Sequence, residues 1–99
     1  MRVEFEDDDL RRLYTDPGFR IARLGPEVTR AYRKRVALLV AVKDERDLYA
    51  MRSLHFEKLS GDRLGQRSIR LNRQWRLILR LEEDERGRLV IVVEIVDYH

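Results

Sequence analysis

Apolar and polar residues alternate along two segments in the second half of the chain, 66–72 and 75–81. A period of two is typical of a strand with one buried face, and the short link of residues 72–74 suits an antiparallel hairpin. An apolar run over 89–96 follows a turn at 83–87 and predicts a buried strand. The buried face would carry Ile69, Leu71, Trp75, Leu77, Leu79 and Leu81, and the opposite face Arg76, Ile78 and Arg80.

The first half of the chain has helical spacing. A short helix is expected from a cap at Asp8 or Asp9 to about Tyr14, ended by residues 16–18 (Asp-Pro-Gly). A second helix begins at residues 25–27 (Gly-Pro-Glu), and a helical turn follows at 44–51. The apolar stripe of the second helix is Val28, Ala31, Tyr32, Val36, Leu39 and Val40. The order predicts one α+β domain over 1–99, with N-terminal helices packed on a C-terminal antiparallel sheet.

Charge is unevenly distributed along these elements. The 99 residues carry a net charge of +3, yet the segment from Arg52 to Arg80 holds eight basic and two acidic residues. Acidic residues gather instead at 4–9 and 82–85. A basic segment rich in arginine favours a polyanionic partner, because guanidinium groups bind phosphate with two hydrogen bonds. A solvated surface of ion pairs is the alternative.

Several classes of protein are excluded by composition. The chain has no cysteine and two histidines, so neither disulfides nor a metal site is expected, and no glycine-rich loop indicates a cofactor. No apolar stretch approaches 18 residues and no secretion signal precedes the domain, which favours a cytoplasmic protein without a membrane span.

The chain ends in an acid, a phenol and an imidazole directly after the apolar run. Asp97, Tyr98 and His99 would be held at the edge of the sheet by the strand before them. Histidine is the side chain best suited to proton transfer near neutral pH. The sequence therefore indicates a candidate catalytic group here, with a solvated chain end as the alternative.

Two stretches of the chain resemble a known family. The strings GDRLGQRSIRLNRQWRLIL at 61–79 and VEIVDYH at 93–99 are similar to the RelE superfamily of toxins, and most of all to its HigB-like branch, the plasmid maintenance killer proteins. The resemblance implies a RelE-like fold and a type II toxin that enters the A site of the 70S ribosome and cleaves the bound mRNA. It also implies a cognate helix-turn-helix antitoxin that neutralises the toxin.

RNA cleavage without a metal needs a base, an acid and cations that stabilise charge on the phosphate. Arg76 is the best candidate for the scissile phosphate, and His99 for the acid or base. Tyr98 would stack on a base or orient the phosphate, and Asp97 would orient a neighbour. Four further arginines would hold the RNA backbone: Arg63, Arg67, Arg70 and Arg73.

His55 and Lys58 reproduce a histidine and lysine that HigB-type toxins carry three residues apart. Counted back from residues 61–62, however, they lie two residues upstream of the familiar positions, where this chain has Glu57 and Ser60. Two residues along a strand displace a side chain by about 6–7 Å, which is too far for proton transfer. Either a local bulge restores both residues or their roles have moved.

Two other functions remain open on the sequence. One is a ParE-like toxin that poisons gyrase with the same fold and without catalytic residues, and Tyr98 and His99 argue against it. The other is an RNA-binding module in which the arginine-rich face acts without catalysis.

Overall fold

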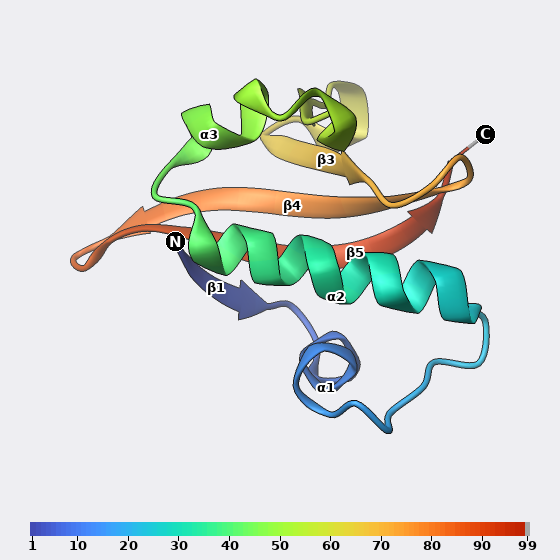
Figure 1. The fold of residues 1–99 in the computed structure, drawn as a ribbon. Helices are drawn as coiled ribbons and strands as arrows, with labels where there is room; N and C mark the ends of the chain where they lie inside the picture. The colour runs from blue at the N-terminus through green and yellow to red at the C-terminus, as the bar shows by residue number, and fades with distance from the viewer. Residues whose placement is uncertain (99) are drawn as a thin grey trace.

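The computed structural model describes residues 1–98 and contains a five-stranded sheet with helices packed against it. The elements, in chain order, are β1 (Arg2–Phe5), α1 (Asp8–Thr15), α2 (Pro26–Ala41), α3 (Glu45–Ala50), β2 (Glu57–Lys58), β3 (Gln66–Arg70), β4 (Trp75–Asp84) and β5 (Gly87–Asp97). The strands lie in the order β1-β5-β4-β3-β2. Figure 1 shows α2 lying across one face of this sheet, with α1 beside β1 and the C-terminus next to the β3–β4 turn.

The predicted helices are confirmed, with one correction at the start of α1. Asp7, and not Asp8 or Asp9, is the N-cap, because its carboxylate accepts a hydrogen bond from the Leu10 amide at 2.8 Å. In α2, Pro26 occupies the start of the helix, where its missing N–H costs nothing. Asp44 and Asp47 form a reciprocal capping box at the start of α3.

The core lies between α1, α2 and the covered face of the sheet. The predicted stripe of α2 is buried at Val28, Tyr32, Val36 and Leu39, whose spacing keeps them on one side of the helix. The prediction that Val40 belongs to the core is wrong. Val40 is 49% exposed, because it lies one residue past Leu39 and so about a quarter-turn round the helix. The sheet contributes Ile69, Leu77 and Leu79, which alternation predicted, and Val90 and Val92 from the apolar run that predicted a buried strand.

The sheet differs from the expected antiparallel meander at both edges. β1 pairs with β5 in parallel, so the sheet is mixed, and β2 adds a two-residue edge strand beside β3. Neither strand was predicted, because four and two residues are too few to show a period of two. The central hairpin is as predicted, and Asn72 closes its turn by accepting hydrogen bonds from the amides of Gln74 and Trp75 at 2.9 and 2.8 Å.

Within residues 1–98, no helix has the length and hydropathy needed to cross a membrane.

Tyr32 joins α2 to α1 through a buried phenol whose hydroxyl donates to the Leu10 carbonyl at 2.7 Å. Burial, with a smaller contribution from Asp7, raises the pKa of this phenol well above its ordinary 10.0. The unfolded chain therefore ionises first, so the stability that neutral Tyr32 provides is complete below pH 10 and is lost as pH rises further.

We expect Tyr32→Phe to lower the free energy of unfolding by about 1 kcal/mol at pH 7, through loss of this hydrogen bond. Above pH 10 the wild-type protein should lose up to about 1.4 kcal/mol per pH unit through ionisation of Tyr32, so the gap between the two proteins should shrink. Urea unfolding of both proteins between pH 7 and 11 measures this gap, and a gap that does not change with pH would contradict the assignment.

Candidate functional site

The arginine of the candidate site lies on the face of the sheet that α2 leaves uncovered. Arg76 is the second residue of β4, directly opposite Arg70 of β3 and Val96 of β5. Because its neighbour Leu77 points into the core, alternation turns Arg76 to the other face. Its side chain is nevertheless only 10% exposed. Neighbouring side chains and backbone therefore surround the guanidinium.

Within residues 1–98, one nitrogen makes all of the hydrogen bonds of the Arg76 side chain. Nη2 lies 2.8 Å from a carboxylate oxygen of Glu57, 2.8 Å from the hydroxyl of Ser68 and 3.0 Å from the carbonyl of His55. The ring of Tyr98 lies 5.2 Å from the guanidinium carbon, within range of a cation–π contact. Among residues 1–98, Nε is the only buried side-chain nitrogen or oxygen without a hydrogen-bond partner.

Glu57 and Ser68 are residues of this site that the sequence did not single out as functional. Glu57 lies on β2 opposite Ser68, and both share the uncovered face with Arg76. The signal that could have found Glu57 is the count back from residues 61–62, which placed Glu57 where the related toxins have a histidine. A carboxylate replaces an imidazole at that point and can accept a proton in its place.

Lys58 is not brought to Arg76. It lies opposite Arg67 on β2 and β3, one residue along from the pair of Glu57 and Ser68, and therefore faces the other side of the sheet. On that side Arg67 forms an ion pair with Glu45 of α3 at 3.4 Å. No bulge in β2 restores the lysine to the position that the resemblance implied.

His55 contributes its backbone to the site. It is the only non-glycine residue with a positive φ among residues 1–98, at φ 48° and ψ 47°, and this bend brings its carbonyl to Arg76. Its imidazole lies elsewhere, with Nε2 at 3.2 Å from a guanidinium nitrogen of Arg70. The side chain and the carbonyl of His55 thus contact two different arginines.

A left-handed backbone costs a residue with a side chain about 1–2 kcal/mol, and glycine avoids that cost. We therefore expect His55→Gly to be more stable than His55→Ala by about 1 kcal/mol in urea unfolding. Both variants lack the imidazole, so the comparison isolates the backbone. Equal stability, or a more stable alanine variant, would contradict the strained conformation.

The C-terminal residues lie beside the β3–β4 turn. The Tyr98 amide donates to the Gln74 carbonyl at 2.6 Å, and the Gln74 amide group donates to the Asp97 carboxylate at 3.0 Å. These contacts hold Asp97 against the turn and leave the Tyr98 ring over the Arg76 guanidinium. His99, the proposed acid or base, lies outside the described residues.

The four arginines expected to hold RNA are in different surroundings. Arg63 pairs with Glu94 and Arg67 with Glu45, whereas Arg70 contacts His55 and the Asn72 carbonyl. Arg70 and the exposed Arg73 line a hollow of about 540 Å³ beside the β3–β4 turn. Arg70 and Arg73, which lie beside the site, therefore form no ion pair with an acidic residue in the described structure.

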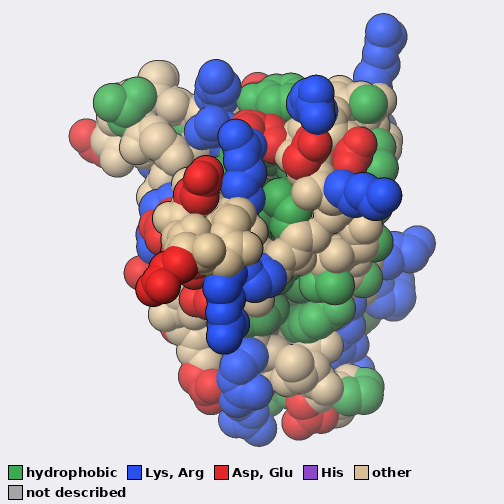
Figure 2. Space-filling view, turned by 90° about the vertical axis from the view of Figure 1, so that its left-hand side faces the viewer, with side chains coloured by type: hydrophobic (Ala, Val, Ile, Leu, Met, Phe, Trp, Pro, Cys, Tyr) green, Lys and Arg blue, Asp and Glu red, His purple; other side chains and the backbone are tan. Residues whose placement is uncertain are grey.

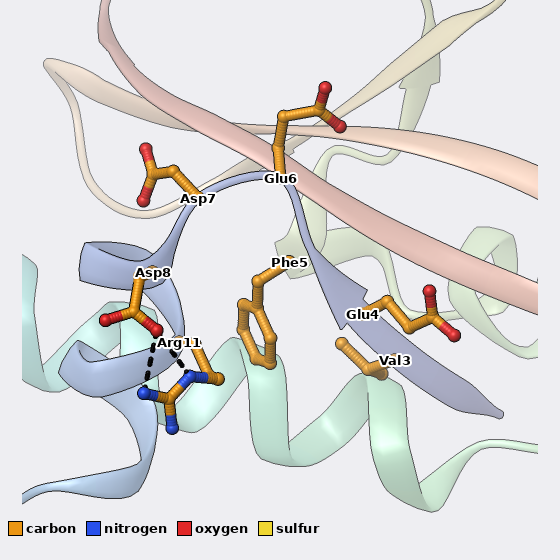
Figure 3. A pocket seen from close by; sticks show the side chains of 7 residues that line it. All are labelled: Val3, Glu4, Phe5, Glu6, Asp7, Asp8 and Arg11. Atoms are coloured by element: carbon orange, nitrogen blue, oxygen red, sulfur yellow. Dashed lines mark hydrogen bonds and ion pairs between the residues drawn. The ribbon is translucent and has the colours of Figure 1, made fainter.

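Other surfaces are less suited to a polyanion. On the side drawn in Figure 2, basic and acidic side chains intermingle, and ion pairs such as Arg2–Asp84 and Arg88–Glu45 lie near the β4–β5 turn. A second hollow, of about 400 Å³, lies between β1 and α1. Figure 3 shows the side chains that line it. Its lining includes four carboxylates, Glu4, Glu6, Asp7 and Asp8, which repel phosphate. Within residues 1–98, no three His, Cys, Asp or Glu side chains form a group suited to a metal ion.

Comparisons with known proteins agree with the fold. Among solved structures, YafQ from E. coli strain BL21(DE3) is 14% identical with a TM-score of 0.66, over 98% of this chain and 93% of that chain. A YoeB/ParE toxin from Agrobacterium tumefaciens is 16% identical with a TM-score of 0.56, over 100% of both chains. At such low identity the likeness shows a shared fold.

No match is found among curated proteins. The model of one family, described as the RelE-like toxin of the type II toxin–antitoxin system HigB, matches residues 3–99. The chain therefore belongs to the HigB-like family of RelE-like toxins of type II toxin–antitoxin systems.

Proposed function

We propose that this toxin is an endoribonuclease that cleaves mRNA in the A site of the translating ribosome, by acid–base chemistry without a metal. The observation that carries the proposal is the convergence of Arg76, Glu57, Ser68 and Tyr98 at one end of the sheet. This end also bears Arg70 and Arg73 beside an open hollow.

Each group has a role that fits its position. Arg76 binds the scissile phosphate and stabilises the charge that develops on it. Glu57, which touches the same guanidinium, is placed to take the proton from the 2′-hydroxyl. His99 then protonates the leaving 5′-oxygen. Tyr98 stacks on a base or orients the phosphate, and Asp97 orients the chain end through Gln74.

The remaining candidates contribute to binding. Arg70 and Arg73 hold the RNA backbone next to the site, and Arg63 and Arg67 add to the basic surface. His55 orients Arg76 and Arg70, whereas Lys58 contacts nucleic acid on the other side of the sheet. Such contacts supply affinity without reading sequence.

The partners follow from the same proposal. The toxin acts in the cytoplasm, where ribosomes and mRNA are found, and a cognate helix-turn-helix antitoxin neutralises it. Ribosomal RNA completes the site, because within residues 1–98 the groups that contact the Arg76 guanidinium include one candidate base, the Glu57 carboxylate.

Primer extension on a defined mRNA tests this function. We expect the purified protein to produce discrete cuts at codon positions when ribosomes translate the mRNA, and none on the same mRNA without ribosomes. Cuts on free RNA would contradict the dependence on ribosomes. Absence of cuts in both reactions, with inhibition of gyrase supercoiling, would instead support the ParE-like alternative.

A further inference from the structure

The surroundings of Arg76 suggest how the site changes when RNA binds, an inference that rests on the proposed function. We infer that the Glu57 carboxylate occupies, in the free toxin, the place on Arg76 that a phosphate takes, and that Ser68 is a positioning residue that holds the guanidinium during the exchange. Glu57 would then leave Arg76 as the phosphate arrives, and its carboxylate would become free to act on the substrate.

Nη2 of Arg76 is surrounded by more acceptors than it has hydrogens to donate. Nη2 of a guanidinium carries two hydrogens, yet three acceptors lie within 3.0 Å of Nη2 of Arg76. At most two of the three can receive a full hydrogen bond at one time. Loss of one acceptor therefore leaves the nitrogen satisfied, so the exchange of that acceptor costs little.

Of the three acceptors, Glu57 is the one that is free to leave. Ser68 is fully buried on β3, and the His55 carbonyl belongs to the backbone, so neither can withdraw without a change in the fold. Glu57 has a side chain that is 50% exposed, on a two-residue strand at the edge of the sheet. Water can therefore stabilise the Glu57 carboxylate once it leaves, whereas Arg76, which is only 10% exposed, needs another anion in its place.

A phosphate can also form a hydrogen bond with Arg76 that Glu57 does not form. Nε of Arg76 is buried and has no hydrogen-bond partner among residues 1–98. A buried donor without an acceptor is costly, and a phosphate offers several acceptor oxygens to a guanidinium. Phosphate can thus satisfy Nε, which the Glu57 carboxylate leaves unbonded, while Ser68 keeps Nη2 in place.

The test uses inorganic phosphate and the full chain, without ribosomes. NMR spectra of the arginine Nε–H groups would follow a phosphate titration in the wild-type protein and in Glu57→Gln. We expect phosphate to shift the Arg76 signal, and Glu57→Gln to bind phosphate about 3- to 10-fold more tightly, since a neutral side chain competes weakly and does not repel the anion.

Glu82→Gln is the matched control, because it removes the same charge from an ion pair with Arg80 on the same strand as Arg76. It should change phosphate affinity less than about twofold, as expected for an exposed pair. Ser68→Ala should weaken phosphate binding and broaden the Arg76 Nε–H signal, and Ser68→Thr, which restores a hydroxyl, should recover both. A purely structural role for Ser68 would lower stability without moving that signal.

Three results would overturn the inference: phosphate that leaves the Arg76 signal unmoved, equal phosphate affinity in Glu57→Gln and the wild type, or an unaltered signal in Ser68→Ala. None of these measurements depends on cleavage. A wild-type protein that exchanges Glu57 for phosphate but cuts no mRNA would support the exchange and refute the proposed activity.

Discussion

Replacing Arg76 with lysine is expected to lower the rate of ribosome-dependent mRNA cleavage by about 100-fold or more, the usual effect of removing one preorganised charge-stabilising donor. Lysine keeps the positive charge, but its ammonium cannot reach Ser68, the His55 carbonyl and a phosphate in the same fixed plane. Single-turnover cleavage of mRNA on stalled ribosomes measures the effect.

Arg80→Lys is the matched control for this prediction. Arg80 lies four residues along β4 on the same face and pairs with Glu82 and Glu6, so the same substitution there should change the rate less than about threefold, as for other surface ion pairs. Urea unfolding of both variants separates loss of the site from loss of the fold. Equal rates in the two variants would show that Arg76 is not the phosphate ligand.

Replacing Glu57 with glutamine is expected to lower cleavage by about 100- to 10,000-fold, the range typical of general acid–base groups. Glutamine preserves the shape of the side chain and removes its ability to accept a proton. The same variant should bind phosphate more tightly, so its defect would appear in the chemical step. Cleavage rates at saturating ribosome complexes therefore provide the measurement.

Lys58→Gln, one residue along β2, provides the comparison. Lys58 faces the other side of the sheet beside Arg67, so its loss should weaken binding modestly and leave the cleavage rate at saturation within about threefold. Full activity in Glu57→Gln together with a large loss in Lys58→Gln would reverse these two roles. It would also mean that β2 rotates about its axis when the toxin enters the ribosome, so that Lys58 faces Arg76.

Alternation and helical spacing predict most of this fold, because the long elements repeat their patterns several times. β4 repeats its alternation of apolar and polar residues over 75–81, β5 follows a largely apolar run, and α2 keeps its stripe from Val28 to Leu39. β1 and β2 show no such repeat. Their pairing is set by contacts far along the chain, Val3 with Val90 and Glu57 with Ser68, which no local pattern contains.

The sequence likewise predicts one part of the candidate site and not the other. Arg76 follows from its position on the polar face of an alternating strand, and Tyr98 from its place after the last strand. The partners of Arg76 do not follow, because Ser68 and Glu57 reach it across three strands, and the His55 carbonyl reaches it through a left-handed bend. A shift of one residue in the pairing of β2 with β3 would bring Lys58, instead of Glu57, to the face that carries Arg76.

The most direct test of the account compares two proteins in one primer-extension assay on a translated mRNA: the wild-type chain and a version that ends at Asp97. The account predicts discrete, ribosome-dependent cuts from the wild-type chain, and their loss when Tyr98 and His99 are removed. Cuts that persist in the shortened protein would contradict a role for the C-terminal residues. The absence of cuts from the wild-type chain would contradict the nuclease itself and favour the gyrase or RNA-binding alternative.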